Sequence, residues 1–145
     1  MNKIQTLLTT TVLLFGISGG VIADFNNGYN AYKKGDYKTA FNEWKPLAEK
    51  GHAGAQFALG WMYASGEGVL KDYKEAVKWY LKAAEQGQAD AQYNLGVMYA
   101  NGKGVLKDLS KAKYWIKKAY ENPDASADTI EIAEKFWNQF ELWKY

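Results

Sequence analysis

Two places in the sequence carry side chains that could support nucleophilic or acid–base chemistry. Ser110-Lys111-Ala112-Lys113 has the S-x-x-K spacing that penicillin-interacting enzymes use for a serine nucleophile. The S-D-N and K-T-G motifs that accompany it in such enzymes are absent from the chain. His52 is the only histidine, and an imidazole needs an oriented acid or nucleophile beside it to catalyse a reaction. We therefore expect Ser110 to be an ordinary helix residue, His52 to be an exposed turn residue, and the protein not to be an enzyme.

The composition excludes several other kinds of site. The chain has no cysteine, which removes disulfides, thiolate metal ligands and cysteine nucleophiles. Paired glycines at Gly66-x-Gly68 and Gly102-x-Gly104 follow predicted helices, whereas dinucleotide-binding loops follow a strand. All 18 basic residues are lysines, although arginine is the residue that reads nucleic acids most effectively. We expect no cofactor, no metal and no nucleic-acid partner.

The elements that carry these residues belong to a tandem repeat. Residues 55–126 are two consecutive copies of one 36-residue unit, identical at 19 of 36 positions without a gap. Repeats with a period between roughly 20 and 50 residues are typical of solenoids, in which each unit buries its apolar face against its neighbours. The repeat therefore predicts an all-α solenoid of antiparallel helix pairs.

Each copy is predicted to form two helices joined by a glycine-containing loop. Apolar residues at helical spacing place the first helix near 55–64 and 91–100. Asp72 and Asp108 directly precede the second helix, where an aspartate accepts hydrogen bonds from the first free backbone amides. We expect these aspartates to be the N-caps of the second helices.

Two sets of positions in the copies predict how the helices pack. Gly60 and Gly96 stand inside the first helices, where each costs about 1 kcal/mol relative to alanine. That cost is explained if the second helix approaches closely at the glycine. In the loops, Val69-Leu70 and Val105-Leu106 are expected to point inward.

The segments on either side of the two copies complete the predicted domain. Residues 24–54 are a degenerate relative of the unit, in which Gly28 stays in register only if about four loop residues are missing. Residues 127–145 have helical periodicity without the repeat motif, and we expect a capping helix there because a solenoid end exposes an apolar face. The predicted solenoid over 24–145 thus has the divisions 24–54, 55–90, 91–126 and 127–145.

Residues 1–23 are predicted to be a secretory signal peptide. Lys3 supplies the positive start, Leu7 to Ile17 the apolar centre, and Val21-Ile22-Ala23 the small-residue cleavage site. The alternative is an uncleaved anchor, because residues 4–23 carry no charge and about 20 residues can span a bilayer. Cleavage would leave a periplasmic or secreted protein with no stable membrane insertion.

The repeat also carries a family resemblance. The segment AQFALGWMYASGEGVLKDYKEAVKWYLKAAEQG closely resembles the Sel-one-like repeat, a relative of the tetratricopeptide repeat. The resemblance covers residues 25–125 and implies a right-handed superhelix of helix pairs that serves protein–protein interaction, usually without enzymatic activity. Some cysteine-rich members are linked to penicillin binding or hydrolysis, and this chain departs from them in having no cysteine.

Seven residues of the first helices lie off the core face and vary between units. In tetratricopeptide-like superhelices these helices line the concave groove, where such side chains can anchor a protein or peptide partner. The alternative is that they pack between units, because a short array has little core. The predicted partner-binding residues are Phe25, Tyr29, Tyr32, Phe57, Trp61, Tyr93 and Val97.

Two functional hypotheses remain open at this point. The first is an exported interaction module whose concave face binds a protein or peptide partner. The second is a cell-envelope enzyme that acts on peptidoglycan or a β-lactam, for which Ser110 is the only candidate nucleophile with a motif.

Overall fold

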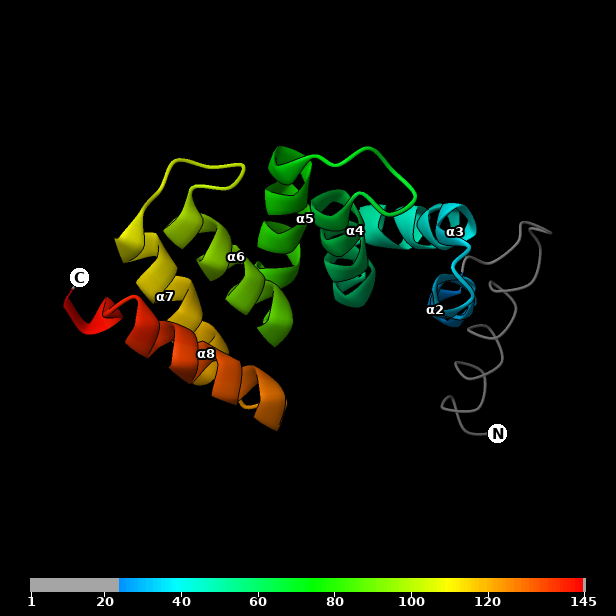
Figure 1. Ribbon diagram of the computed structural model, residues 1–145. Coiled ribbons are helices and arrows are strands. Elements are labelled where there is room, and N and C mark those ends of the chain that lie inside the picture. The colour runs from blue at the N-terminus through cyan, green and yellow to red at the C-terminus, as the bar shows by residue number, and fades with distance from the viewer. Residues whose placement is uncertain (1–23, 145) are drawn as a thin grey trace, which may run out of the picture.

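The structure is a computed structural model that describes residues 24–144. This part of the chain forms seven α-helices and one short 3-10 helix, with no strand, so the predicted all-α solenoid is confirmed (Figure 1). The predicted signal peptide, residues 1–23, lies outside the described residues. The elements are α2 (Phe25–Lys33), α3 (Tyr37–Glu49), α4 (Ala53–Ser65), α5 (Tyr73–Glu85), α6 (Ala89–Asn101), α7 (Leu109–Tyr120), α8 (Ala127–Gln139) and η1 (Leu142–Lys144).

The helices form three pairs that stack one after another along an arc. The pairs are α2 with α3, α4 with α5, and α6 with α7, and they join through contacts of α3 with α4 and of α5 with α6 (Figure 1). The helix α8 packs on α7 and closes the end of the array. The predicted cap is shorter than expected, because Glu141 takes a positive φ of 50° and turns the chain into η1, where Leu142 is fully buried.

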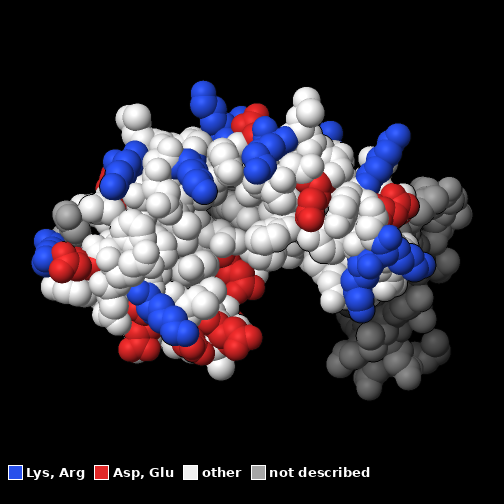
Figure 2. All heavy atoms as spheres, in the orientation of Figure 1, with Lys and Arg blue, Asp and Glu red and all other residues white. Residues whose placement is uncertain are grey.

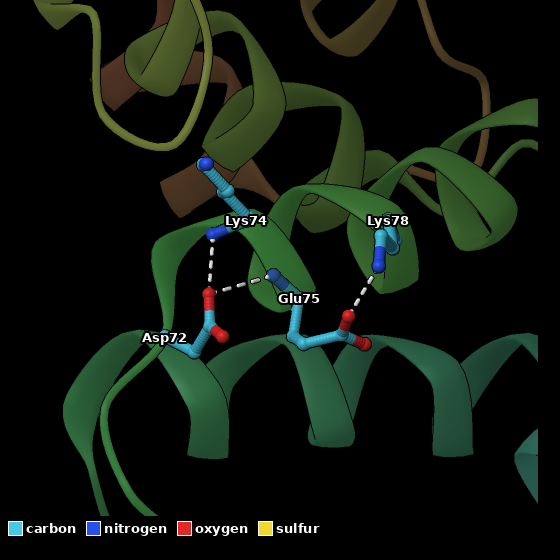
Figure 3. A network of polar contacts seen from close by, with 4 residues as sticks. All are labelled: Asp72, Lys74, Glu75 and Lys78. Atoms are coloured by element: carbon cyan, nitrogen blue, oxygen red, sulfur yellow. Dashed lines mark hydrogen bonds and ion pairs between the residues drawn. The ribbon is translucent and has the colours of Figure 1, made fainter.

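Polar side chains begin the helices as predicted. The Asp72 carboxylate accepts hydrogen bonds from the backbone amides of Lys74 (2.9 Å) and Glu75 (3.1 Å), which fixes the start of α5 (Figure 3). Asp108 accepts one from Lys111 in the same way. His52 is exposed as expected, and its imidazole is also the N-cap of α4, a role not predicted from the sequence.

Gly60 and Gly96 mark close contacts within their helix pairs. A Cβ atom at Gly60 would lie 2.5 Å from the ring of Tyr80 on α5, and one at Gly96 would lie 2.7 Å from Ile116 on α7. Both distances are far below van der Waals contact, so the absence of a side chain is what lets the second helix approach. The predicted reason for these glycines is confirmed.

In each loop between the paired helices of the two copies, one of the two residues expected to point inward does so. Val69 and Val105 are half-buried against the core clusters of the array. Leu70 and Leu106 are instead 91% exposed, so the expectation that they tuck inward is wrong. Adjacent residues in an extended loop point in opposite directions, and only the valine of each pair faces the core.

A buried amide relay joins successive helix pairs. The Gln56 side chain in α4 donates a hydrogen bond to the backbone oxygen of Ala48 (3.0 Å) and accepts one from Gln86 (2.7 Å). The same arrangement recurs one unit later around Gln92, whose side-chain oxygen accepts from Asn122 at 3.0 Å. Gln56 and Gln92 are both almost fully buried. Loss of these partners would leave a buried amide unpaired and lower the free energy of unfolding.

Replacing Gly60 with alanine tests the close helix contact. Helix propensity alone would stabilise the protein by about 1 kcal/mol, but the added methyl group must displace the Tyr80 ring. We expect a net loss of about 1–3 kcal/mol in the free energy of unfolding, measured by urea denaturation. Leu70→Ser is the control and should change stability by less than about 0.5 kcal/mol. A stabilised Gly60→Ala variant would contradict the proposed contact.

Candidate groove and its aromatic pocket

Five of the seven predicted partner-binding residues meet in one pocket. This aromatic pocket has a volume of about 310 Å³ and is formed by α2, α3 and α4. Its lining is almost entirely apolar and comes from consecutive helix pairs, so the stacking of the array creates it. The lining residues are Phe25, Tyr29, Tyr32, Trp44, Gly54, Phe57, Ala58 and Trp61.

A second pocket of about 290 Å³ lies one unit further along the array. Trp61 lines both pockets and is therefore the wall between them, and Val97 lines the second pocket. Tyr93 lines neither of them, because its ring packs edge-on against Phe136 of α8 at a centroid distance of 6.0 Å. The structure thus places five of the predicted residues in the aromatic pocket and Val97 in the second pocket, whereas Tyr93 packs against the cap.

The pocket residues differ in how much packing they provide. Phe25 stacks between Trp44 (5.7 Å) and His52 (5.1 Å), and Phe57 packs on Tyr80 (5.8 Å). These two phenylalanines therefore hold helices together, as the packing alternative expected. Tyr29 and Trp61 are 50% and 46% exposed, so their contribution to partner binding stays a prediction.

A polar network lies at the rim of the aromatic pocket. The Tyr32 hydroxyl donates a hydrogen bond to Glu67 Oε2 (2.9 Å), and Trp61 Nε1 donates to both the Tyr32 oxygen (2.9 Å) and Glu67 Oε2 (3.2 Å). The Ser65 hydroxyl donates to the same carboxylate oxygen at 3.3 Å. The network fixes the ring planes of Tyr32 and Trp61 and places one carboxylate beside them.

The electrostatics of Tyr32 follow from this arrangement. Partial burial raises the pKa of its hydroxyl above the ordinary value of 10.0, and the hydrogen bond to Glu67 raises it further. The hydrogen bond from Trp61 works in the opposite direction and lowers the pKa. Tyr32 therefore remains a protonated donor at neutral pH and keeps Glu67 in place.

Glu67 and Trp44 are not among the residues predicted from the sequence. Glu67 stands where the next copy has Lys103, a reversal of charge in two otherwise similar glycine loops. This charge difference between the copies is the feature of the sequence that indicates different roles for the two loops. Trp44 lies in the degenerate first unit and matches Tyr80 at an offset of 36, so its place under Gly28 could have been inferred from the repeat.

The candidate nucleophile is not part of the groove. Ser110 is exposed in the first turn of α7 and lines neither groove pocket. Within residues 24–144, no group of three His, Cys, Asp or Glu side chains could hold a metal ion. Between residues 24 and 144, the structure contains no helix with the length and hydropathy of a bilayer-spanning segment.

The arrangement of stacked helix pairs with a lined groove defines an α-solenoid of short helical repeats. The model of the Sel1 repeat family matches residues 53–88 and 89–124, which are the units formed by α4 with α5 and by α6 with α7. The chain is thus a Sel1 repeat protein, and the resemblance seen in the sequence is confirmed.

Relatives with these repeats include curated and structurally solved proteins. An exopolysaccharide production negative regulator of Rhizobium leguminosarum bv. viciae is 43% identical over 61 residues, 38% of this chain and 23% of that protein. A Sel1 repeat protein from Oxalobacter formigenes matches with a TM-score of 0.70 and 35% identity, over 79% of this chain and 46% of the other.

A protective antigen present in uropathogenic Escherichia coli strains, displaying an SLR fold, matches with a TM-score of 0.64 and 29% identity. That match covers 99% of this chain and 35% of the antigen. The chain therefore spans about a quarter of the curated relative and less than half of these two solved structures.

Two alanine variants should separate the packing residues from the exposed ones. Phe57→Ala removes a ring that packs on Tyr80, and we expect it to lower the free energy of unfolding by about 2–4 kcal/mol. Trp61→Ala removes a half-exposed ring and should cost about 1 kcal/mol or less. Thermal unfolding followed by circular dichroism measures both. Equal losses would show that Trp61 is as important for packing as Phe57.

Proposed function

We propose that this protein is an exported interaction module that binds a protein or peptide partner through the concave surface of its first helices. Sel1 repeat proteins are generally protein-interaction modules, and typically they are non-catalytic scaffolds. The observation that carries the proposal for this chain is the aromatic pocket, where half-exposed Tyr29 and Trp61 lie over a floor of packed rings. Aromatic residues of this kind are the commonest anchors of protein interfaces.

The pocket is suited to binding because its walls are already held in place. Tyr32 and Trp61 are fixed by the network around Glu67, and Trp44 Nε1 donates a hydrogen bond to the backbone oxygen of Phe25 at 3.0 Å. A partner that enters such a pocket does not have to order these side chains, so little conformational entropy is lost on binding. Figure 2 shows the molecule hollowed on its lower side, which leaves room for an extended partner.

We also propose that the module performs no catalysis of its own. The competing hypothesis of an envelope enzyme depends on Ser110, which is exposed on a helix away from both groove pockets. Acyl transfer at a serine needs a base and donors that stabilise an oxyanion, and these function best in a water-excluding cleft.

Capture of the partner tests the concave surface. The protein is crosslinked in intact cells and purified, and its bound partner is compared between wild type, Trp61→Ala and Tyr114→Ala. Tyr114 is the matched control, because it is 52% exposed on α7 and lines neither groove pocket. We expect Trp61→Ala to reduce capture at least about tenfold, as for a central aromatic anchor, and Tyr114→Ala to leave it unchanged. Equal capture by all three proteins would refute binding in the groove.

Export is tested separately by the mature N-terminus. Cleavage after Ala23 gives a chain that begins at Asp24, the residue whose carboxylate caps α2 by accepting from the amide of Asn26. We therefore expect N-terminal sequencing of the protein from the cell exterior or periplasm to start at Asp24. Recovery of the intact chain from the membrane fraction would support the uncleaved anchor instead.

A further inference from the structure

We propose that the aromatic pocket binds a cationic side chain, lysine or arginine, presented by the partner peptide, with Glu67 as its counter-ion. The proposal rests on the proposed function, since it specifies the chemistry of the residue that enters the groove. It follows from the way in which Glu67 is held, from the rings around it, and from the different charge in the neighbouring pocket.

Glu67 has one oxygen occupied and one available. Tyr32, Trp61 and Ser65 all donate to Oε2, whereas Oε1 accepts no hydrogen bond from residues 24–144. The three donors are neutral, and no lysine in this part of the chain forms an ion pair with Glu67. The carboxylate is therefore positioned by the protein but not neutralised by it.

The aromatic rings beside Glu67 supply the second component of a cation site. Tyr29 and Trp61 line the pocket and are about half exposed, and ring faces attract cations through their quadrupoles. Lys33 illustrates this property, because its ammonium group lies 5.5 Å from the centre of the Tyr29 ring. The apolar floor suits the aliphatic stem of a lysine or arginine, while the charged end reaches the rim.

The second pocket has the opposite charge at the corresponding place. Lys103 replaces Glu67 in the next copy and lines that pocket, with its ammonium group 5.6 Å from the centre of the Tyr73 ring. Ala64 stands where the first unit has Tyr32, so no hydroxyl is available there to hold an acidic residue. Of the two loops, only the first therefore places a carboxylate beside the rings of the aromatic pocket, and the second places an ammonium group at the second pocket.

Three blocked tripeptides test the charge preference directly. They are Gly-Lys-Gly, Gly-norleucine-Gly and Gly-Glu-Gly, each acetylated and amidated, and the readout is the indole N–H signal of Trp61 in ¹H–¹⁵N spectra of the full protein. Norleucine keeps the carbon chain of lysine without the charge. The Trp61 signal is assigned by its absence from a Trp61→Phe variant.

We expect the lysine peptide to bind roughly tenfold more tightly than the norleucine peptide, and its affinity to fall as salt is added. Glu67→Gln keeps an acceptor for Tyr32 and Trp61 but removes the charge, so it should bring the two affinities to within about twofold of each other. Lys103→Gln is the matched control and should leave the tenfold ratio intact. Unchanged melting temperatures confirm that both variants are folded.

Equal affinity for the lysine and norleucine peptides would overturn the proposal, and so would the absence of any shift with the lysine peptide. An equal loss of the preference in Glu67→Gln and Lys103→Gln would also overturn it, because removal of a positive charge cannot weaken the electrostatic attraction of a cation and the loss would then be a general effect of substitution. These outcomes are distinct from failure of the proposed function. If Trp61→Ala abolishes partner capture while no peptide shows a preference, the groove binds its partner by other contacts.

Discussion

The close contact between a glycine of the first helix and a large side chain of the second is the constraint on which the array depends. It occurs once in each of the three helix pairs, although the large side chain is different in each. Where it is tryptophan, the same ring also lines the aromatic pocket, so the contact that joins two helices also sets the pocket floor. The three contacts are Gly28 with Trp44, Gly60 with Tyr80, and Gly96 with Ile116.

The aromatic pocket belongs to the junction between two units. Tyr32 comes from the first unit, and Glu67 from the loop of the second, 35 residues later in the chain. The first unit has a shorter loop but keeps its helix in register, and in that alignment Tyr32 occupies a place where the other units have alanine. A feature that interrupts the repeat is therefore what distinguishes the first pocket from the second. A perfect repeat would have given two equivalent pockets.

Much of the fold could be predicted because its determinants are local or periodic. Asp72 caps its helix through bonds to residues two and three positions away, and Gly60 marks a contact that recurs at a fixed period. The outward direction of Leu70 could not be predicted, since a single loop residue has no periodicity. The Glu67 network was missed for a related reason: its partners lie in different units, and their meeting depends on how the units stack. Tyr93 was placed on the correct helix, but the cap that covers it has no counterpart in the repeat.

The buried amide relay has a consequence for the curvature of the array. Each relay joins successive helix pairs by directional hydrogen bonds to an almost fully buried glutamine, so a change in the rotation between the pairs would leave that amide unpaired. In a solenoid without such bonds, the rotation between successive pairs can change gradually. Here the hydrogen bonds restrain the rotation at both junctions, and they therefore also restrain the distance between the aromatic pocket and the second pocket. A partner that contacts both pockets must match that distance, so the array would select its partner by the spacing of its anchor residues as well as by their chemistry.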